Sequence, residues 1–300
     1  FENLVGSQLA DTLTGDAGAN KIYGGNGNDV IEGGAGADYI DGENDVDTIT
    51  YAHSKFGVKV DLSLQGVGPQ QALVLGVADD AAGDDLHGIE NVIGTAKDDW
   101  IQGDGNDNVI EGGLGNDVLI GTGSEDTVSF ESSTKAIFFD FALEGVSGTW
   151  NTGAGIDTIM GFGRVIGGKA GDTLIGEVNG DYITGGLGAD TLTGELGADK
   201  FIYRNLAEKG DHITDFTSGQ DVIMIHGRIE ALHEQILRRR RGRLERGQAT
   251  DLLGLGLRVH AQEVRHLELV LDVLVHADHD VLADPVALLV APGRLVDLAG

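Results

Sequence analysis

The chain has 300 residues, with 49 glycines, 3 prolines and no cysteine, and its formal net charge is −29 at pH 7. This acidity argues against a nucleic-acid-binding protein, because phosphates would repel such a surface. The lack of cysteine excludes disulfide and zinc-finger frameworks, and no apolar run approaches the ~20 residues that span a bilayer. The sequence begins at Phe1 in mid-motif, without Met or a signal peptide, which we interpret as a fragment or a processed product.

A nine-residue repeat begins at Gly6 and recurs in three blocks along the chain. The first block, within 1–51, holds GSQLADTLT, GDAGANKIY, GGNGNDVIE, GGAGADYID and GENDVDTIT. The second, 94–129, holds GTAKDDWIQ, GDGNDNVIE, GGLGNDVLI and GTGSEDTVS. The third begins at Gly167 with GGKAGDTLI, GEVNGDYIT, GGLGADTLT and GELGADKFI.

Two positions of the repeat are nearly invariant. The eighth residue is always apolar, from Leu13 and Ile22 to Phe201. The sixth is Asp, or Asn as the nearest oxygen-bearing substitute, in every nonapeptide: Asp11, Asn20, Asp29, Asp38, Asp47, Asp99, Asn108, Asp117, Asp126, Asp172, Asp181, Asp190 and Asp199.

This spacing predicts a β-solenoid. Six Gly-rich residues form a tight turn, and the next three alternate as a short strand with one apolar side chain inward. Two nonapeptides make one coil, and stacked coils bury a continuous apolar column. Stacking also aligns the carboxylates of every second nonapeptide, as in the pairs Asp11–Asp29, Asp29–Asp47, Asp99–Asp117, Asp172–Asp190 and Asp181–Asp199.

Carboxylates stacked ~4.8 Å apart would repel one another, so the pattern predicts bound divalent cations between the turns. The available ligands are hard oxygens. The chain has no Cys, and no His occupies a conserved position of the repeat, which disfavours zinc or copper. Ca²⁺ accepts 6–8 oxygens in loose geometry, whereas Mg²⁺ demands octahedral order. Besides the sixth-position residues, the candidate ligands are backbone carbonyls in the four most regular turns: Gly24, Asn26, Asn28, Gly33, Ala35, Ala37, Gly112, Leu114, Asn116, Gly185, Leu187 and Ala189.

The nonapeptides GGNGNDVIE, GGAGADYID, GGLGNDVLI and GGLGADTLT resemble the repeat of RTX, or haemolysin-type calcium-binding, proteins at every defined position. The resemblance covers residues 1–225. It implies an all-β parallel β-roll with several Ca²⁺ ions in its turns. It also implies a product that a type I machinery secretes unfolded and that folds on meeting extracellular calcium. GSQLADTLT, GTAKDDWIQ, GENDVDTIT and GEVNGDYIT lack turn glycines, so we expect weak or empty sites at the block ends.

Two β-rich inserts, 52–93 and 130–166, separate the blocks. The segments 58–62 (VKVDL) and 136–141 (AIFFDF) alternate like strands. We interpret the inserts as elaborations packed on or between the rolls, in preference to a ligand surface. The third block extends to 225 through a segment, 203–225, that resembles the segment closing RTX rolls in secreted proteases and lipases, and that we expect to act as a cap.

The tail, 226–300, has a different composition. Residues 227–300 carry 10 Arg against 11 acidic residues and lack Asn, Ser, Lys and all aromatics except His. We favour an out-of-frame translation after a frameshift near His226, or a poorly ordered segment. A helical segment over Arg228–Arg246 is the alternative.

Catalytic motifs are missing from the sequence. The HEQIL at His233 lacks the second His of the metalloprotease helix, and there is no G-x-S-x-G elbow. The missing motifs predict a chain without catalysis of its own, the repeat predicts calcium binding, and the resemblance implies an extracellular or cell-surface protein. The alternative is the C-terminal calcium-binding region of a secreted lipase, protease or alginate epimerase whose catalytic domain lies upstream.

Overall fold

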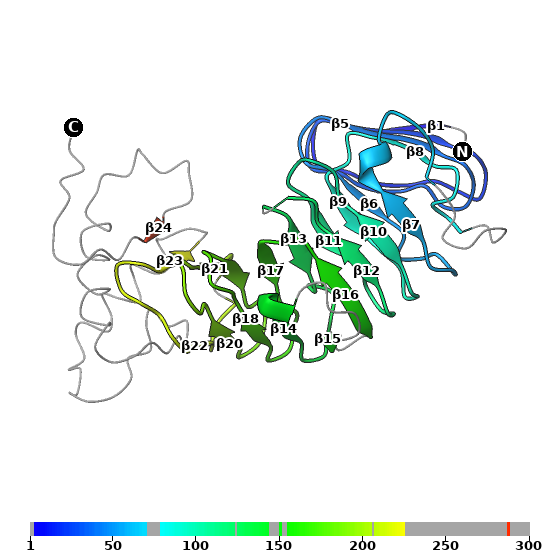
Figure 1. Cartoon of the computed structure of the whole chain (residues 1–300). Helices are drawn as coiled ribbons and strands as arrows, with labels where there is room; N and C mark the ends of the chain where they lie inside the picture. The colour runs from blue at the N-terminus through cyan, green and yellow to red at the C-terminus, as the bar shows by residue number, and fades with distance from the viewer. Residues whose placement is uncertain are drawn as a thin grey trace, which may run out of the picture. The chain divides into compact units, whose positions relative to one another are not determined.

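The computed structural model describes residues 3–70, 79–123, 125–143, 150–151, 155–205, 207–225 and 287–288. The chain divides into two compact units, Phe1–Lys135 with Leu143–Ile166, and Ala136–Ala142 with Gly167–Gly300. As predicted, the fold is almost entirely parallel β-structure, and the helices in this described part are short 3-10 turns (Figure 1). No helix there is long and apolar enough to cross a membrane.

The first unit is a roll whose successive strands belong to alternate sheets. One side of the roll carries a single sheet, and the other carries two. The single sheet is β2 (Thr12–Thr14), β4 (Val30–Glu32), β6 (Thr48–Thr50), β9 (Asn91–Ile93), β11 (Val109–Glu111), β13 (Thr127–Ser129) and β17 (Arg164–Ile166). The second sheet consists of β1 (Asn3–Val5), β3 (Lys21–Gly25), β5 (Tyr39–Glu43) and β8 (Asp85–His87). The third consists of β7 (Lys59–Asp61), β10 (Trp100–Gln102), β12 (Val118–Ile120) and β16 (Ile156–Met160). A short strand, β15 (Trp150–Asn151), pairs antiparallel with β16.

The second unit repeats this plan. One of its ladders is β14 (Phe138–Asp140), β18 (Thr173–Ile175), β20 (Thr191–Thr193) and β22 (His212–Ile213). The other is β19 (Tyr182–Thr184), β21 (Lys200–Tyr203), β23 (Val222–Ile225) and the antiparallel β24 (Ala287–Leu288). Apart from β24, the predictions for 226–300 fall outside the described residues.

The strand register confirms the predicted coil of two nonapeptides. Within the blocks, each apolar eighth residue pairs with its equivalent in the second nonapeptide along, as in Leu13 with Ile31 and Ile101 with Leu119. These side chains form the core. Ile22, Ile31 and Ile40 have no exposed surface, so the apolar column supplies the hydrophobic stabilisation of the stack.

The inserts supply rungs of the rolls rather than elaborations packed on them. In the first insert, β8 continues the ladder after β5, and β9 lies between β6 and β11. The same insert starts a new sheet with β7, which is followed by the 3-10 turn η1 (Leu62–Leu64). In the second insert, β14 starts a sheet of the second unit in the same way, and it is followed by the 3-10 turn η2 (Phe141–Leu143). A spacing other than two nonapeptides is therefore compatible with the stack when the extra residues loop out between strands.

Two glutamine amides bridge backbone within the first insert. The Gln70 side chain accepts from the Asp61 N–H at 2.7 Å and donates to the Asp61 carbonyl at 3.1 Å. Gln65 makes the same pair with Ile89, at 2.8 and 2.7 Å. Each amide thus replaces a peptide group of a neighbouring strand.

Replacing Gln70 with Ala is expected to lower the free energy of unfolding of the calcium-loaded chain by about 1–3 kcal/mol. The reason is that the half-buried N–H and carbonyl of Asp61 lose their partners. Urea denaturation at saturating calcium measures this, with Gln102→Ala as the control because Gln102 makes one side-chain contact at 3.4 Å. Equal losses in the two variants would contradict the bridging role.

Candidate metal centre

Six of the turns between strands have left-handed backbone at the second and fourth repeat positions. In the turn that ends at Asp29, these are Gly25 (φ 111°) and Gly27 (φ 96°). A Cβ on Gly25 would lie 2.3 Å from the Ser7 carbonyl oxygen of the preceding rung, so glycine serves both the conformation and the close stacking. The turn of GENDVDTIT keeps left-handed residues without glycine, at Glu43 (φ 70°) and Asp45 (φ 76°).

The sixth-position aspartates form hydrogen-bonded ladders along the roll. In each step, one carboxylate oxygen, Oδ1, accepts the backbone N–H of the aspartate one rung earlier. All five predicted pairs are confirmed: Asp11–Asp29 at 2.7 Å, Asp29–Asp47 at 2.8 Å, Asp99–Asp117 at 2.9 Å, Asp172–Asp190 at 2.8 Å and Asp181–Asp199 at 3.0 Å.

The ladders extend beyond the nonapeptides to residues that the repeat spacing missed. Asp38 N–H donates to Asp84, Asp117 N–H to Asp157, Asp190 N–H to Asp211 and Asp199 N–H to Asp221, at 2.8–3.1 Å. Asp47 N–H donates to Glu90 at 2.7 Å. Each of the four aspartates precedes a buried apolar residue by two positions, as in Asp211-His212-Ile213. A search for Asp-x-apolar without a fixed period would have found them.

The second carboxylate oxygen, Oδ2, divides the turns into two classes. In the first class it accepts the N–H of the residue four positions earlier, so the turn is self-capped. Ser7 caps Asp11 at 2.5 Å, Thr95 caps Asp99 at 2.6 Å and Thr122 caps Asp126 at 2.6 Å. Gly168 and Glu177 cap Asp172 and Asp181 in the same way. In Asn20 and Asn108 the amide oxygen takes this N–H, from Asp16 and Asp104.

In the second class, Oδ2 is buried and has no hydrogen-bond partner within the described structure. The residue four positions earlier is left-handed in the nonapeptide turns of this class, so its N–H points elsewhere, as at Gly25, Gly113 and Glu195. The members of the class are Asp29, Asp38, Asp47, Asp117, Asp190, Asp199 and Asp211.

The two classes separate the predicted ligands. The four turns whose carbonyls were predicted as ligands each end in an unpartnered carboxylate, at Asp29, Asp38, Asp117 and Asp190. Asp47 and Asp199 join them, whereas Asp11, Asn20, Asp99, Asn108, Asp126, Asp172 and Asp181 are self-capped. Both sixth-position Asn residues, Asn20 and Asn108, belong to the self-capped class, where a single side-chain oxygen is enough to accept the capping N–H.

Burial changes the proton affinity of these carboxylates. Removal from water raises the pKa of Asp47 to about 6 and of Asp117 to about 8, and the ladder hydrogen bonds offset this in part. The pKa of Asp190 is raised to about 8 and that of Asp199 to about 7 by the same cause. A buried, unpartnered carboxylate is costly as an anion, so each such turn favours a proton or a cation.

The donor set fits calcium. Unpartnered carboxylate oxygens and turn carbonyls are hard ligands. In the part of the chain that the structure describes, no group of three or more His, Asp or Glu side chains gathers into a metal site. Backbone carbonyls of Gly24, Asn26, Asn28 and their equivalents would therefore complete the 6–8 oxygens that Ca²⁺ takes. A bound Ca²⁺ would supply positive charge between successive turns.

Comparison with known proteins agrees with this chemistry. The family model of the RTX calcium-binding nonapeptide repeat matches in four copies, at residues 5–40, 14–49, 88–129 and 166–201. No curated protein matches the chain. The matched segments contain every second-class turn except that of Asp211. These segments are RTX calcium-binding nonapeptide repeats, and they fold as a parallel β-roll.

Proposed function

We propose that this chain is the calcium-responsive module of a secreted protein, and that calcium ions in the second-class turns couple its folding to the extracellular medium. The observation that carries the proposal is the set of buried, unpartnered Oδ2 atoms stacked along the ladders. A buried carboxylate without a hydrogen-bond partner is costly as an anion, so a counter-ion in these turns would stabilise the fold. Calcium binding then contributes directly to the free energy of folding.

The acidity of the chain supports coupling to an external ion. At −29, the metal-free chain repels itself, which opposes compaction. Calcium affinities of ~10⁻⁴–10⁻³ M, typical of extracellular modules, would leave the chain unfolded inside a cell and folded outside it. An unfolded chain is also the form that a type I secretion machinery would export.

Limited proteolysis tests this coupling. Full-length chain is digested at calcium concentrations from about 1 µM to about 10 mM, which bracket the affinity of extracellular modules. Residues 3–225 are expected to be cleaved at the low end and protected at the high end, with magnesium giving no protection. Protection that is equal at all calcium concentrations would refute the proposal.

The chain is proposed to act without catalysis of its own. If it is instead the C-terminal region of a secreted lipase, protease or alginate epimerase, calcium removal should abolish the catalytic activity of the longer protein, while this chain alone shows none. Lipase, protease and alginate-epimerase assays on the longer protein distinguish the two, and any turnover by the chain alone would contradict both.

A further inference from the structure

Two turns of the roll contain an asparagine followed directly by a glycine. Asn26 precedes Gly27 in the first block, and Asn179 precedes Gly180 in the third. Asparagine is chemically labile, most of all before glycine, which has no side chain to hinder the approach of its backbone nitrogen to the Asn side chain. Both asparagines are exposed, so water reaches each of them. Any difference in their reactivity must therefore come from the hydrogen bonds around them.

The reaction that such a pair undergoes is deamidation, which consumes water and releases ammonia. The glycine backbone nitrogen loses its proton and attacks the Asn side-chain carbonyl carbon. A new N–C bond closes a succinimide ring, and the side-chain nitrogen leaves as ammonia. Water then opens the ring at either carbonyl, which gives Asp or isoaspartate. Ring closure thus needs a free glycine N–H and an Asn side chain that can turn toward it.

The roll holds both reacting groups at Asn26 and Gly27. The Gly27 N–H donates to Asp45 Oδ2, one rung later, at 2.8 Å. Asn26 Oδ1 accepts from Asn44 Nδ2 at 3.0 Å, and the Asn26 N–H donates to the Ser7 carbonyl at 3.2 Å. An N–H that donates to a carboxylate is harder to deprotonate, because the hydrogen bond stabilises its neutral form. The folded roll therefore opposes ring closure at this turn.

The turn at Asn179 and Gly180 lacks this restraint. Among the residues that the structure describes, none accepts a hydrogen bond from the exposed Gly180 N–H. Asn179 Nδ2, the nitrogen that leaves, donates to Glu177 Oε1 at 2.8 Å. A Cβ at Gly180 would lie 2.7 Å from the Ala198 carbonyl oxygen of the next rung. The close stacking of the rungs thus requires the glycine that makes Asn179 labile.

We propose that Asn179 is a site of spontaneous deamidation in the folded roll, and that Asn26 is a second site that calcium-driven folding protects. The calcium dependence at Asn26 rests on the proposed function, whereas the reactivity of Asn179 and the protection by Asp45 do not. Isoaspartate at position 26 turns the backbone carbonyl, a candidate calcium ligand, into a free carboxylate and routes the chain through the side chain. Calcium thus preserves a turn that binds it, and a chain that stays unfolded loses that turn.

Peptide mapping by mass spectrometry on the full chain tests both sites. During incubation at mildly alkaline pH in saturating calcium, deamidation is expected to accumulate at Asn179 while Asn26 keeps its amide. In EDTA, both asparagines should react. An intact amide at Asn179 after long incubation in calcium would overturn that site, and equal rates at the two positions in calcium would overturn the protection of Asn26.

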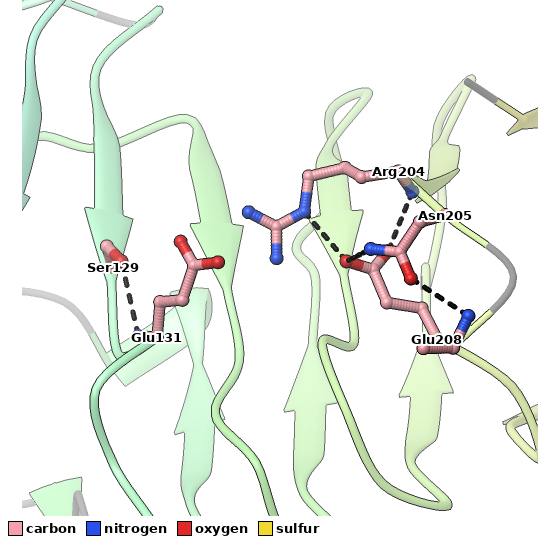
Figure 2. A network of polar contacts seen from close by, with 6 residues as sticks. Ser129, Glu131, Arg204, Asn205 and Glu208 are labelled. Carbon is pink, nitrogen blue, oxygen red and sulfur yellow. Dashed lines mark hydrogen bonds and ion pairs between the residues drawn. The ribbon is translucent and has the colours of Figure 1, made fainter. Parts of the chain in front are cut away.

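Asn205 is the internal reference in the same digests. It is followed by leucine rather than glycine. Its side chain donates to Glu208 Oε1 at 3.3 Å and accepts the Ala207 N–H at 2.8 Å (Figure 2). Asn205 should keep its amide in calcium. Loss of its amide as fast as that of Asn179 would show general hydrolysis in place of a glycine-dependent site.

A matched pair of variants tests the hydrogen bond to Gly27. Asp45→Ala removes the acceptor, and Glu43→Ala leaves it in place. Asp45 and Glu43 both have left-handed backbone (φ 76° and 70°), so the two substitutions carry similar backbone strain. In calcium, Asp45→Ala should raise the deamidation rate of Asn26 at least about tenfold, which equals ~1.4 kcal/mol, roughly the low end for a hydrogen bond to a charged group. Equal rates in the two variants, both folded by circular dichroism, would overturn the role of Asp45.

The failure of this inference is distinguishable from that of the proposed function. If circular dichroism shows the chain folded in EDTA and Asn26 stays intact there, the proposed calcium coupling fails, and the two variants still decide the role of Asp45. If the chain is unfolded in EDTA and Asn26 nevertheless keeps its amide, the site at Asn26 is overturned while the calcium coupling stands.

Discussion

Asp29→Asn is expected to weaken calcium binding at its turn by at least about tenfold, the low end of what loss of even an outer-shell metal partner costs. The Asn side chain can still accept the Asp11 N–H through its oxygen, as Asp29 does at 2.7 Å. Its amide group replaces the unpartnered Oδ2, and an NH₂ donor cannot ligate a cation. The calcium midpoint of folding should therefore rise, as circular dichroism would measure.

Asp11→Asn is the matched control. Asp11 lies one rung earlier in the same ladder, and its Oδ2 is already taken by the Ser7 N–H. Asn20 and Asn108 show that an amide fits a self-capped turn, since each accepts the corresponding N–H at 2.8 Å. The calcium midpoint of Asp11→Asn should stay close to that of the wild type. Equal shifts in the two variants would contradict the division of the turns into two classes.

The metal-free chain is expected to be more ordered near pH 5 than near pH 8.5. Burial raises the pKa of Asp47 to about 6, of Asp199 to about 7 and of Asp117 to about 8, against about 3.9 in an unfolded chain. The folded state therefore binds more protons, so its stability is fully present below pH ~4 and is lost as the pH rises through 6–8. Protons thus substitute in part for the missing cations.

The same linkage requires calcium binding to release protons near neutral pH. Calorimetric titrations in buffers of different ionisation enthalpy should give different apparent enthalpies, and calcium affinity should fall as the pH is lowered from 8 to 6. Metal-free order that increases from pH 5 to 8.5, or proton uptake on binding, would contradict the raised pKa values of these carboxylates.

The β-roll could be predicted from the sequence because the sixth and eighth positions of the nonapeptide repeat regularly. The strand register reproduces this period, as in the pairing of Ile31 with Ile49. Sequence reasoning missed Asp84 and Asp211 because their rungs follow inserted residues, and a periodic search stops where the spacing changes. The inserts were predicted as packed elaborations for the same reason.

The separation of self-capped from unpartnered turns was only partly readable in the sequence. Glycine at the second position marks most unpartnered turns, for example Gly25 and Gly113. However, Glu195 adopts the left-handed conformation (φ 64°) without being glycine, and Gly168 caps Asp172 despite being one. The stacked rungs determine these backbone angles, so the local sequence alone does not.

Far-UV circular dichroism of the full chain during a calcium titration tests the central claim most directly. At neutral pH in EDTA, the spectrum is expected to show little β-structure. Calcium should then induce it cooperatively around 10⁻⁴–10⁻³ M, roughly the range of extracellular modules, and EDTA should reverse the change. Magnesium at the same concentrations should leave the chain unfolded. A β-sheet spectrum that is the same in EDTA and in calcium would contradict the account.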